Sequence, residues 1–166
     1  MAEIWEWLKN AAEWCWAFDE VRYTVDAIVK IGLAALLSGI IGFEREHSHR
    51  PAGFRTHILV SVGSALVMLT SVYIAKEQGL TTDVTRMSAQ VLSGIGFLGA
   101  GTILREGFSV KGLTTAASLW AVSCIGIAVG SGFIVGGLVP TSLISINKSL
   151  PAEPRTINLL RELSVR

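Results

Sequence analysis

Charged residues are scarce in this chain of 166 residues: they make up 16% of it, against 51% hydrophobic residues, and the formal net charge is +1. Soluble domains contain about 25% charged residues, so this composition argues against an ordinary soluble domain. No nucleic-acid partner is expected. The only two cysteines, Cys15 and Cys124, imply no disulfide framework. The N-terminus lacks the basic start and small-residue cleavage site of a signal peptide, so we expect it to stay attached.

Catalytic motifs are missing as well. The chain contains no HExxH sequence, no GxxxxGKS/T sequence and no paired aspartates within an apolar segment, so we do not expect an enzyme or a bound cofactor. His47, His49 and His57 lie on or beside one loop, without a nearby cysteine ligand. We interpret them as residues at the level of the lipid headgroups rather than as metal ligands.

Long apolar segments dominate what is present. Residues 56–75 and 87–104 carry no charge and reach the roughly 18 to 20 residues that cross a bilayer core. Residues 113–146 are long enough for two short spans, with a turn at the Gly-Ser-Gly sequence in their middle. The sequence therefore predicts an all-α polytopic membrane protein with about five transmembrane helices, at residues 27–43, 56–75, 87–104, 113–129 and 132–146. Pro140 lies in the last of these, which is expected to tilt, kink or re-enter.

Two flanking segments complete the predicted organisation. In residues 1–26, apolar residues recur at helical spacing among several tryptophans, which predicts an amphipathic helix in the outer membrane interface. Alternatively, this segment simply lengthens the first span. The transmembrane domain then covers residues 27–146, and residues 147–166 form a short tail.

Basic residues gather in alternate connections. Residues 44–55, residues 105–111 and the tail are rich in arginine and lysine, whereas residues 1–26 are acidic and residues 76–86 are balanced. Since short cytoplasmic loops are enriched in lysine and arginine, the pattern predicts an N-terminus outside and a C-terminus in the cytoplasm.

Small residues recur along several predicted spans, where they allow helices to approach closely in a bilayer. The first span repeats Gly32, Ala35, Gly39 and Gly42 along one face, and the fourth repeats Ala117, Ala121, Cys124 and Ala128. The third span contains Gly94, Gly96, Gly99 and Gly101, and the fifth contains Gly132 and Gly136. These residues are interpreted mainly as packing within the chain, with subunit contacts as the alternative. A homodimer or larger oligomer is also predicted, with the first-span stripe as the favoured interface.

Several motifs occur in order along the chain. They are Gly39–Glu46, which reads G-x-x-G-x-E-R-E; Pro51–His57, which reads P-A-G-x-R-T-H; Asp83–Arg86, which reads D-x-x-R; Ala89–Gly101, which reads A-Q-x-x-S-G-I-G-F-L-G-A-G; and Lys111–Ala117, which reads K-G-L-T-T-A-A. Together they resemble the MgtC/SapB family of bacterial membrane proteins, over about Ala27 to Gly132.

The resemblance implies an inner-membrane protein tied to growth under magnesium limitation and, in pathogens, to survival inside host cells. Better-studied members of that family are regarded as regulators of other membrane machinery, notably the ATP synthase, rather than proven magnesium carriers. Two departures stand out. The chain ends about twenty residues after the last span, so we expect it to be a short form without the soluble C-terminal domain of longer members. Val84 follows Asp83 where that family often has proline.

Two polar clusters are candidate functional sites. The first follows the first span and contains Glu44, Arg45, Glu46, Arg50 and Arg55. It is read as surface ion pairing that sets the topology, as an ion-pair lock, as a headgroup site or as the mouth of an ion path. Arg55 is expected to pair with a residue such as Glu44.

The second cluster borders and lines the third span, and contains Asp83, Arg86, Gln90, Ser93, Arg105, Glu106 and Lys111. Asp83 and Arg86 are expected to pair at the outer boundary. Gln90 and Ser93 share one face of the predicted helix. We favour tight packing there, with Gln90 hydrogen-bonded to a neighbouring span, over a locally unwound helix that exposes carbonyls to an ion.

The leading hypothesis for function is a membrane regulator that acts by helix-to-helix contact with another membrane complex. The alternative is a transporter or channel for divalent cations or small solutes. A transporter normally needs an ionisable or carbonyl-rich site near the middle of the membrane. Apart from Lys30, every charge here is predicted at a boundary, which favours the regulator.

Overall fold

The computed structural model describes residues 2–78, 83–107 and 109–147. Its elements are α1 (Ala2–His47), α2 (Phe54–Gln78), α3 (Thr85–Gly101), β1 (Leu104–Glu106), β2 (Ser109–Lys111), α4 (Leu113–Gly130) and α5 (Ile134–Asn147). The helices follow one another in the predicted order, so the all-α membrane fold is confirmed. Three segments, Glu20–His47, Phe54–Glu77 and Leu113–Gly130, are long and apolar enough to cross a membrane, and Ile134–Ile146 is a shorter apolar helix. Helix α3 has 17 residues.

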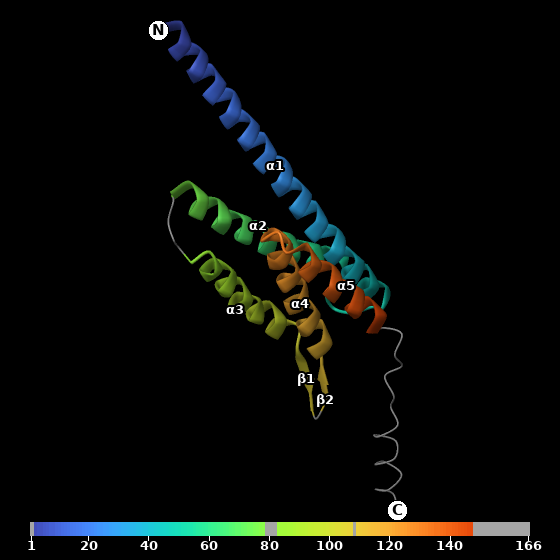
Figure 1. Cartoon of the computed structure of the whole chain (residues 1–166). Helices are drawn as coiled ribbons and strands as arrows, with labels where there is room; N and C mark the ends of the chain where they lie inside the picture. Colours follow the sequence, from blue (N-terminus) through green and yellow to red (C-terminus); the bar gives the residue numbers. More distant parts are fainter. Residues whose placement is uncertain (1, 79–82, 108, 148–166) are drawn as a thin grey trace, which may run out of the picture.

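Helix α4 lies at the centre of the bundle and contacts α1, α2, α3 and α5 (Figure 1). One face of α4 is buried through Leu119, Val122, Ile125 and Val129. Ala34, Leu37 and Ile41 of α1 and Ala65 of α2 complete the main core around the last three of these residues. The bundle is therefore held together by an apolar face of its central helix.

Close packing of α4 against α2 depends on two glycines that the predicted stripes did not include. A Cβ at Gly126 would lie 2.2 Å from the carbonyl oxygen of Ser61, and a Cβ at Gly130 would lie 2.7 Å from that of Ala65. The predicted α4 stripe was wrong as a packing face inside the chain, because Ala117 is exposed and its other members are only half-buried. The small residues that permit close approach lie on the neighbouring face.

The other predicted glycines divide into packed and open positions. At Gly42 a Cβ would meet Phe54 and His57 of α2 at 2.9 Å, and at Gly39 it would meet the Phe54 ring at 3.2 Å. The nearest atom to a Cβ at Gly99 is the Cβ of Ala116, at 3.4 Å, and Gly136 lies against the ring of Phe133. Gly32, Gly94, Gly96 and Gly101 have nothing within 4 Å of a built Cβ. Ala35, the remaining member of the predicted first-span stripe, is half-buried.

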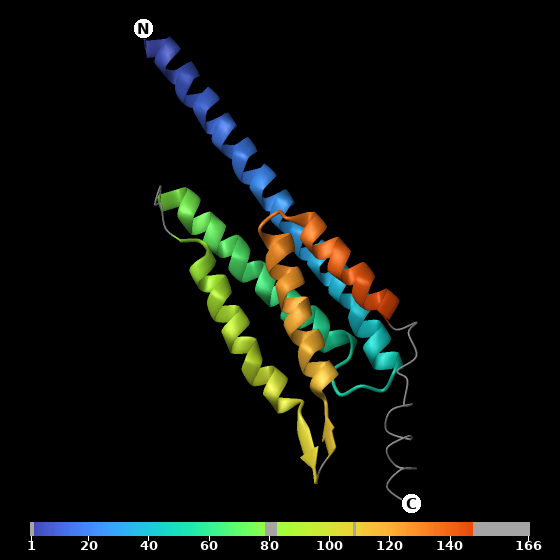
Figure 2. The same cartoon turned by 60° about the horizontal axis from the view of Figure 1, so that its bottom comes forward.

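The N-terminal segment is continuous with the first span. Helix α1 runs without a break for 46 residues and extends beyond the rest of the bundle (Figures 1 and 2). The segment therefore lengthens the first helix, as in the alternative reading, rather than forming a separate helix. No glycine or proline precedes Gly32, so nothing in the local sequence interrupts the helix.

A short hairpin follows α3 and was not predicted. The third span was expected to run to Leu104, but α3 ends at Gly101, and Leu104 begins a strand that pairs with Lys111. The chain returns to α4 at Gly112, which has φ +91° and lies so close to Thr102 that a Cβ there would be 1.9 Å from the Thr102 carbonyl oxygen. Only glycine fits this close return. The hairpin projects from one end of the bundle (Figure 2).

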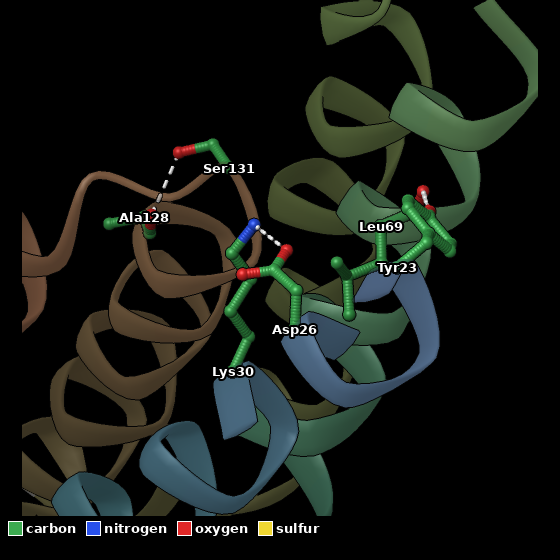
Figure 3. A network of polar contacts seen from close by, with 6 residues as sticks. All are labelled: Tyr23, Asp26, Lys30, Leu69, Ala128 and Ser131. Atoms are coloured by element: carbon green, nitrogen blue, oxygen red, sulfur yellow. Dashed lines mark hydrogen bonds and ion pairs between the residues drawn. The ribbon is translucent and has the colours of Figure 1, made fainter. Parts of the chain in front are cut away.

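Polar contacts lie at the opposite end of the bundle, and one of them joins α1 to α2 (Figure 3). Lys30 lies beside the α4–α5 turn and forms an ion pair with Asp26, with an N–O distance of 2.5 Å. The hydroxyl of Tyr23 donates a hydrogen bond to the carbonyl oxygen of Leu69 in α2. At the C-terminal end of α4, the hydroxyl of Ser131 donates a hydrogen bond to the carbonyl oxygen of Ala128. The charge of Lys30, the only one predicted within a span, is therefore neutralised by a residue one helical turn away.

Candidate functional site at the shared end of α1, α2 and α4

Four polar side chains are buried together where α1 ends and where α2 and α4 begin. Arg45 of α1 is 8% exposed, His57 of α2 is 0% exposed, and Thr115 and Ser118 of α4 are 1% and 9% exposed. These helix ends lie at the same end of the bundle as the hairpin (Figure 2). We call these four residues the buried polar cluster.

Hydrogen bonds connect the members of this cluster across the helices. The guanidinium of Arg45 donates from Nη2 to Oγ1 of Thr115 at 3.2 Å. The Nδ1 of His57 lies 2.8 Å from the carbonyl oxygen of Gly53 and therefore carries the hydrogen, while its Nε2 lies 3.1 Å from Oγ of Ser118. The Ser118 hydroxyl also lies 2.8 Å from the carbonyl oxygen of Thr115. The cluster thus ties α1 and α2 to the first turns of α4.

Arg45 is the least satisfied member of the cluster. Its Nε is buried and has no hydrogen-bond partner. Among the described residues, no carboxylate lies within ion-pair distance of the guanidinium. Burial of a charge is costly unless the charge is paired. Arg45 therefore combines a buried positive charge with an unused donor.

Buried hydroxyls continue from this cluster along the α2–α4 contact. The hydroxyl of Ser61 donates to the carbonyl oxygen of Ala34 at 3.2 Å, and the hydroxyl of Ser64 lies 3.2 Å from that of Ser123. Ser61 and Ser123 are 0% exposed. These serines are polar interruptions in apolar spans, which was the one sequence signal that could have located them.

The predicted loop cluster divides into two groups. Glu46 accepts a hydrogen bond from the backbone N–H of Phe54 at 2.8 Å and thereby caps α2. Arg50 and Arg55 are exposed. The expected pairing of Glu44 with Arg55 was wrong: within the described residues Glu44 accepts a hydrogen bond from Ser48, one turn away on its own helix.

The interpretation of His57 as a residue at headgroup level was also wrong, because its ring is enclosed between α2 and α4. Its position one turn into α2 places it on the face that packs against the bundle. His47 and His49, by contrast, are exposed. In the segments that the structure describes, no three histidine, cysteine, aspartate or glutamate side chains are grouped so that they could hold a metal ion.

The polar residues before α3 form a local hydrogen-bonded turn rather than the expected ion pair. The Asp83 carboxylate accepts hydrogen bonds from the backbone N–H and the hydroxyl of Thr85, at 2.9 and 2.5 Å. These two hydrogen bonds, the hydroxyl contributing most, hold the pKa of Asp83 below its ordinary value, and the attraction of Arg86 adds less. Arg86 is exposed and forms no ion pair with a described residue. The two hydrogen bonds from Thr85 satisfy the Asp83 carboxylate without an ion pair to Arg86.

Gln90 and Ser93 are both exposed on α3. Helix α3 is continuous through both residues, so the alternative of a locally unwound helix was wrong. The expected hydrogen bond from Gln90 to a neighbouring span is absent among the described residues, because Gln90 faces away from α2 and α4. The buried side of α3 is instead formed by Ser88, Ile95 and Gly99.

The residues expected at the inner end of the third span lie in the hairpin. Arg105 and Glu106 belong to β1, and Lys111 belongs to β2. The Nε of exposed Arg105 donates to the carbonyl oxygen of Gly107 at 3.2 Å. These residues are therefore separated from the buried polar cluster, apart from the link that Gly112 makes to the first turn of α4.

Comparisons of the sequence with known proteins identify the family of the chain. The model of the MgtC family matches residues 31–152. The chain is 47% identical over 118 residues to Protein MgtC of Brucella abortus (strain 2308), covering 70% of this chain and 48% of that protein. It is 41% identical over 119 residues to the "Putative magnesium transporter YhiD" of Escherichia coli (strain K12), covering 69% and 55% of the two chains. It is 40% identical over 113 residues to Protein SapB of Bacillus subtilis (strain 168), covering 65% and 49%.

The chain spans about half the length of these curated relatives. No solved structure matches it significantly. The matched region begins in α1 and includes both the buried polar cluster and the exposed side of α3. With a family match over most of its length and helices suited to a bilayer, this chain is a membrane protein that belongs to the MgtC family.

Proposed function

We propose that the protein is a regulatory membrane protein in the adaptation of bacteria to low magnesium and, in pathogens, to survival inside host cells. It acts by helix-to-helix contact with another membrane complex, such as the ATP synthase, and not as an enzyme. The magnesium link is supported by family membership and by the name of one relative, the "Putative magnesium transporter YhiD".

The observation that carries this proposal is the exposed side of α3, which we define as Gln90, Ser93, Gly94, Gly96 and Phe97. Gly94 and Gly96 have nothing within 4 Å of a built Cβ, and Phe97 is 84% exposed. Small residues let a second backbone approach closely, and a glutamine facing lipid gains from a hydrogen-bonding partner. This side of α3 therefore has the composition of a helix interface but no helix of its own chain against it.

Substitution of Gln90 by leucine tests the proposal. Since Gln90 is exposed, Gln90→Leu should leave expression, insertion and thermal stability close to those of the unaltered protein. It should nevertheless abolish the support of growth in low-magnesium medium. Ser142→Leu, at an exposed position of α5, is the matched control and should support normal growth. Normal growth of Gln90→Leu would show that this side of α3 is not the functional contact.

The alternative function is transport of a divalent cation or a small solute, and the buried hydroxyls of the α2–α4 contact favour it. Against cation transport, the buried guanidinium of Arg45 lies at one end of that row and repels a cation. A flux assay in proteoliposomes separates the two functions. Saturable cation flux by the purified protein would contradict regulation as its sole activity.

We also propose that the protein lies in the inner membrane with its N-terminus outside and its C-terminus in the cytoplasm. Glu77 and Ser109 are exposed and lie on opposite sides of the predicted third span. After replacement of Cys15 and Cys124, an impermeant maleimide should label Glu77→Cys but not Ser109→Cys in cells with a permeabilised outer membrane. The reverse pattern would invert the topology.

The proposed homodimer needs a revised interface. Gly39 and Gly42 of the predicted stripe are occupied by residues of α2, whereas Gly96 of α3 is open. Gly96→Leu should therefore lower self-association in bilayers, while Gly39→Leu should damage the fold. If Gly96→Leu leaves self-association unchanged, α3 is not the dimer interface.

A further inference from the structure

We propose that Arg45 is the anchor of an anion site at the N-terminus of α4, and that its ligand is a phosphate group, either free or in the headgroup of an anionic phospholipid. This inference goes beyond the proposed function and does not depend on it. It rests on the buried guanidinium, its unused donor and the helix end that the guanidinium contacts.

The charge of Arg45 has no carboxylate in direct contact with it, and the neighbouring Glu44 attracts it only from beyond ion-pair distance. The residue is 8% exposed, its Nε has no hydrogen-bond partner, and the part of the chain that the structure describes offers it no carboxylate within ion-pair distance. An arginine fork matches the oxygens of a phosphate group, because its planar donors can bind two of them at once. A phosphate oxygen would provide both the missing charge and the missing acceptor.

The N-terminus of α4, which lies beside Arg45, also favours a bound anion. Arg45 donates to Thr115, which is the third residue of α4, so the guanidinium lies against the first turn of an 18-residue helix. The N-cap residue is Gly112, which has no side chain to cap the free N–H groups. A helix N-terminus carries partial positive charge and favours an anion. Placing a buried guanidinium there, without an anion, puts two positive groups together.

The side chains that contact the guanidinium or its partners carry no negative charge. Thr115 and Ser118 provide hydroxyl groups at the first turn of α4, the imidazole of His57 is engaged by Gly53 and Ser118, and Glu44 is an acidic neighbour whose charge acts on Arg45. No three carboxylate, histidine or cysteine side chains gather as a metal site within the described ranges. The exposed turn between α1 and α2 follows closely after Arg45, with the backbone N–H of Arg50 bonded to the Arg45 carbonyl oxygen. Because the Arg45 side chain is 8% exposed, a ligand reaches it only if neighbouring segments move.

Thermal unfolding of the full chain in neutral detergent tests the proposal. A ligand that binds only the folded state raises the unfolding temperature in proportion to the logarithm of its excess concentration. One series uses inorganic phosphate against sodium chloride of equal ionic strength. A second uses phosphatidylglycerol against phosphatidylcholine. Stabilisation by phosphate identifies a free-anion site, and stabilisation by phosphatidylglycerol alone identifies a headgroup site. Absence of saturable stabilisation in both series would overturn the proposal.

Matched arginine variants separate this site from general surface charge. Arg45→Gln should weaken the apparent affinity about tenfold or more, which is the effect of losing a charge-assisted hydrogen bond. Arg50→Gln and Arg55→Gln remove equally charged but exposed side chains and should keep the affinity. Equal losses in all three would refute a specific site. If Arg45→Gln does not fold, Thr115→Val removes the acceptor that positions the guanidinium, and unchanged phosphate and lipid affinities in that variant would contradict the proposal.

Discussion

The carboxylate of Glu46 accepts a hydrogen bond from the backbone N–H of Phe54 at 2.8 Å, so the last turn of α1 caps the first turn of α2. The same carboxylate lies 2.9 Å from where a Cβ of Gly53 would be. A negative charge at a helix N-terminus also interacts favourably with the helix dipole. One acidic side chain thus fixes the connection between two membrane helices, directly beside the buried polar cluster.

Removal of this cap should weaken the connection. Glu46→Ala should lower the free energy of unfolding by about 1 kcal/mol, the usual cost of a lost helix cap. Glu44→Ala is the control, because Glu44 only accepts a hydrogen bond from exposed Ser48, and it should have a smaller effect. Unfolding in mild detergent followed by circular dichroism measures both. Equal effects of the two substitutions would argue against the cap.

A methyl group at Gly126 should disrupt the central contact between α2 and α4. Its Cβ would lie 2.2 Å from the carbonyl oxygen of Ser61, so the helices must separate, and Gly126→Ala should cost roughly 1 to 3 kcal/mol or more. Gly32→Ala places the same methyl group where nothing lies within 4 Å, and should be neutral or stabilising by up to about 1 kcal/mol. Comparable losses of thermal stability in both variants would contradict this account.

The hydrogen bonds from Thr85 should determine the titration of Asp83. Because they favour the ionised carboxylate, the pKa of Asp83 lies below its ordinary value. The contribution of these two hydrogen bonds to stability is therefore fully present above the ordinary pKa, and it is lost as the pH falls through the lowered pKa. Thr85→Ala should raise the midpoint in a carboxyl ¹³C titration, and Thr114→Ala, at an exposed position of α4, should leave it unchanged. An unaltered midpoint in Thr85→Ala would exclude the hydroxyl as the cause.

The number and order of the helices could be predicted from the sequence because a bilayer requires long uncharged segments. Each uncharged segment became a helix, and the glycine-rich break after residue 129 became the α4–α5 turn. The end of the third span could not be located this way, because Thr102, Ile103 and Leu104 are as compatible with lipid as with a strand. Only the close return of the chain at Gly112 shows why α3 ends early.

The packed faces could be predicted only in part. Gly39 and Gly42 pack against α2 as expected, but these helices are largely apolar and their small residues occur on more than one face. On α4 the stripe through Ala121 and the stripe through Gly126 are both plausible in sequence, and the shape of α2 decides between them. The candidate site was predicted in part. Arg45 was among its candidates, but Thr115, which bonds Arg45, and Ser118, which bonds His57, were not, because their burial depends on contacts with distant residues.

His57 should be essential to the fold at the buried polar cluster. Its ring is fully buried and joins Gly53 at the start of α2 to Ser118 of α4. His57→Ala leaves a cavity and removes the imidazole hydrogen bonds to Gly53 and Ser118, so the free energy of unfolding should fall by roughly 2 to 4 kcal/mol. His49→Ala removes an exposed imidazole from the adjacent turn and should change stability little. Thermal unfolding in detergent compares the two, and a similar small effect in both would place His57 at the surface. His57→Gln, which keeps a donor and an acceptor, should recover part of the loss if hydrogen bonding as well as volume matters at this position.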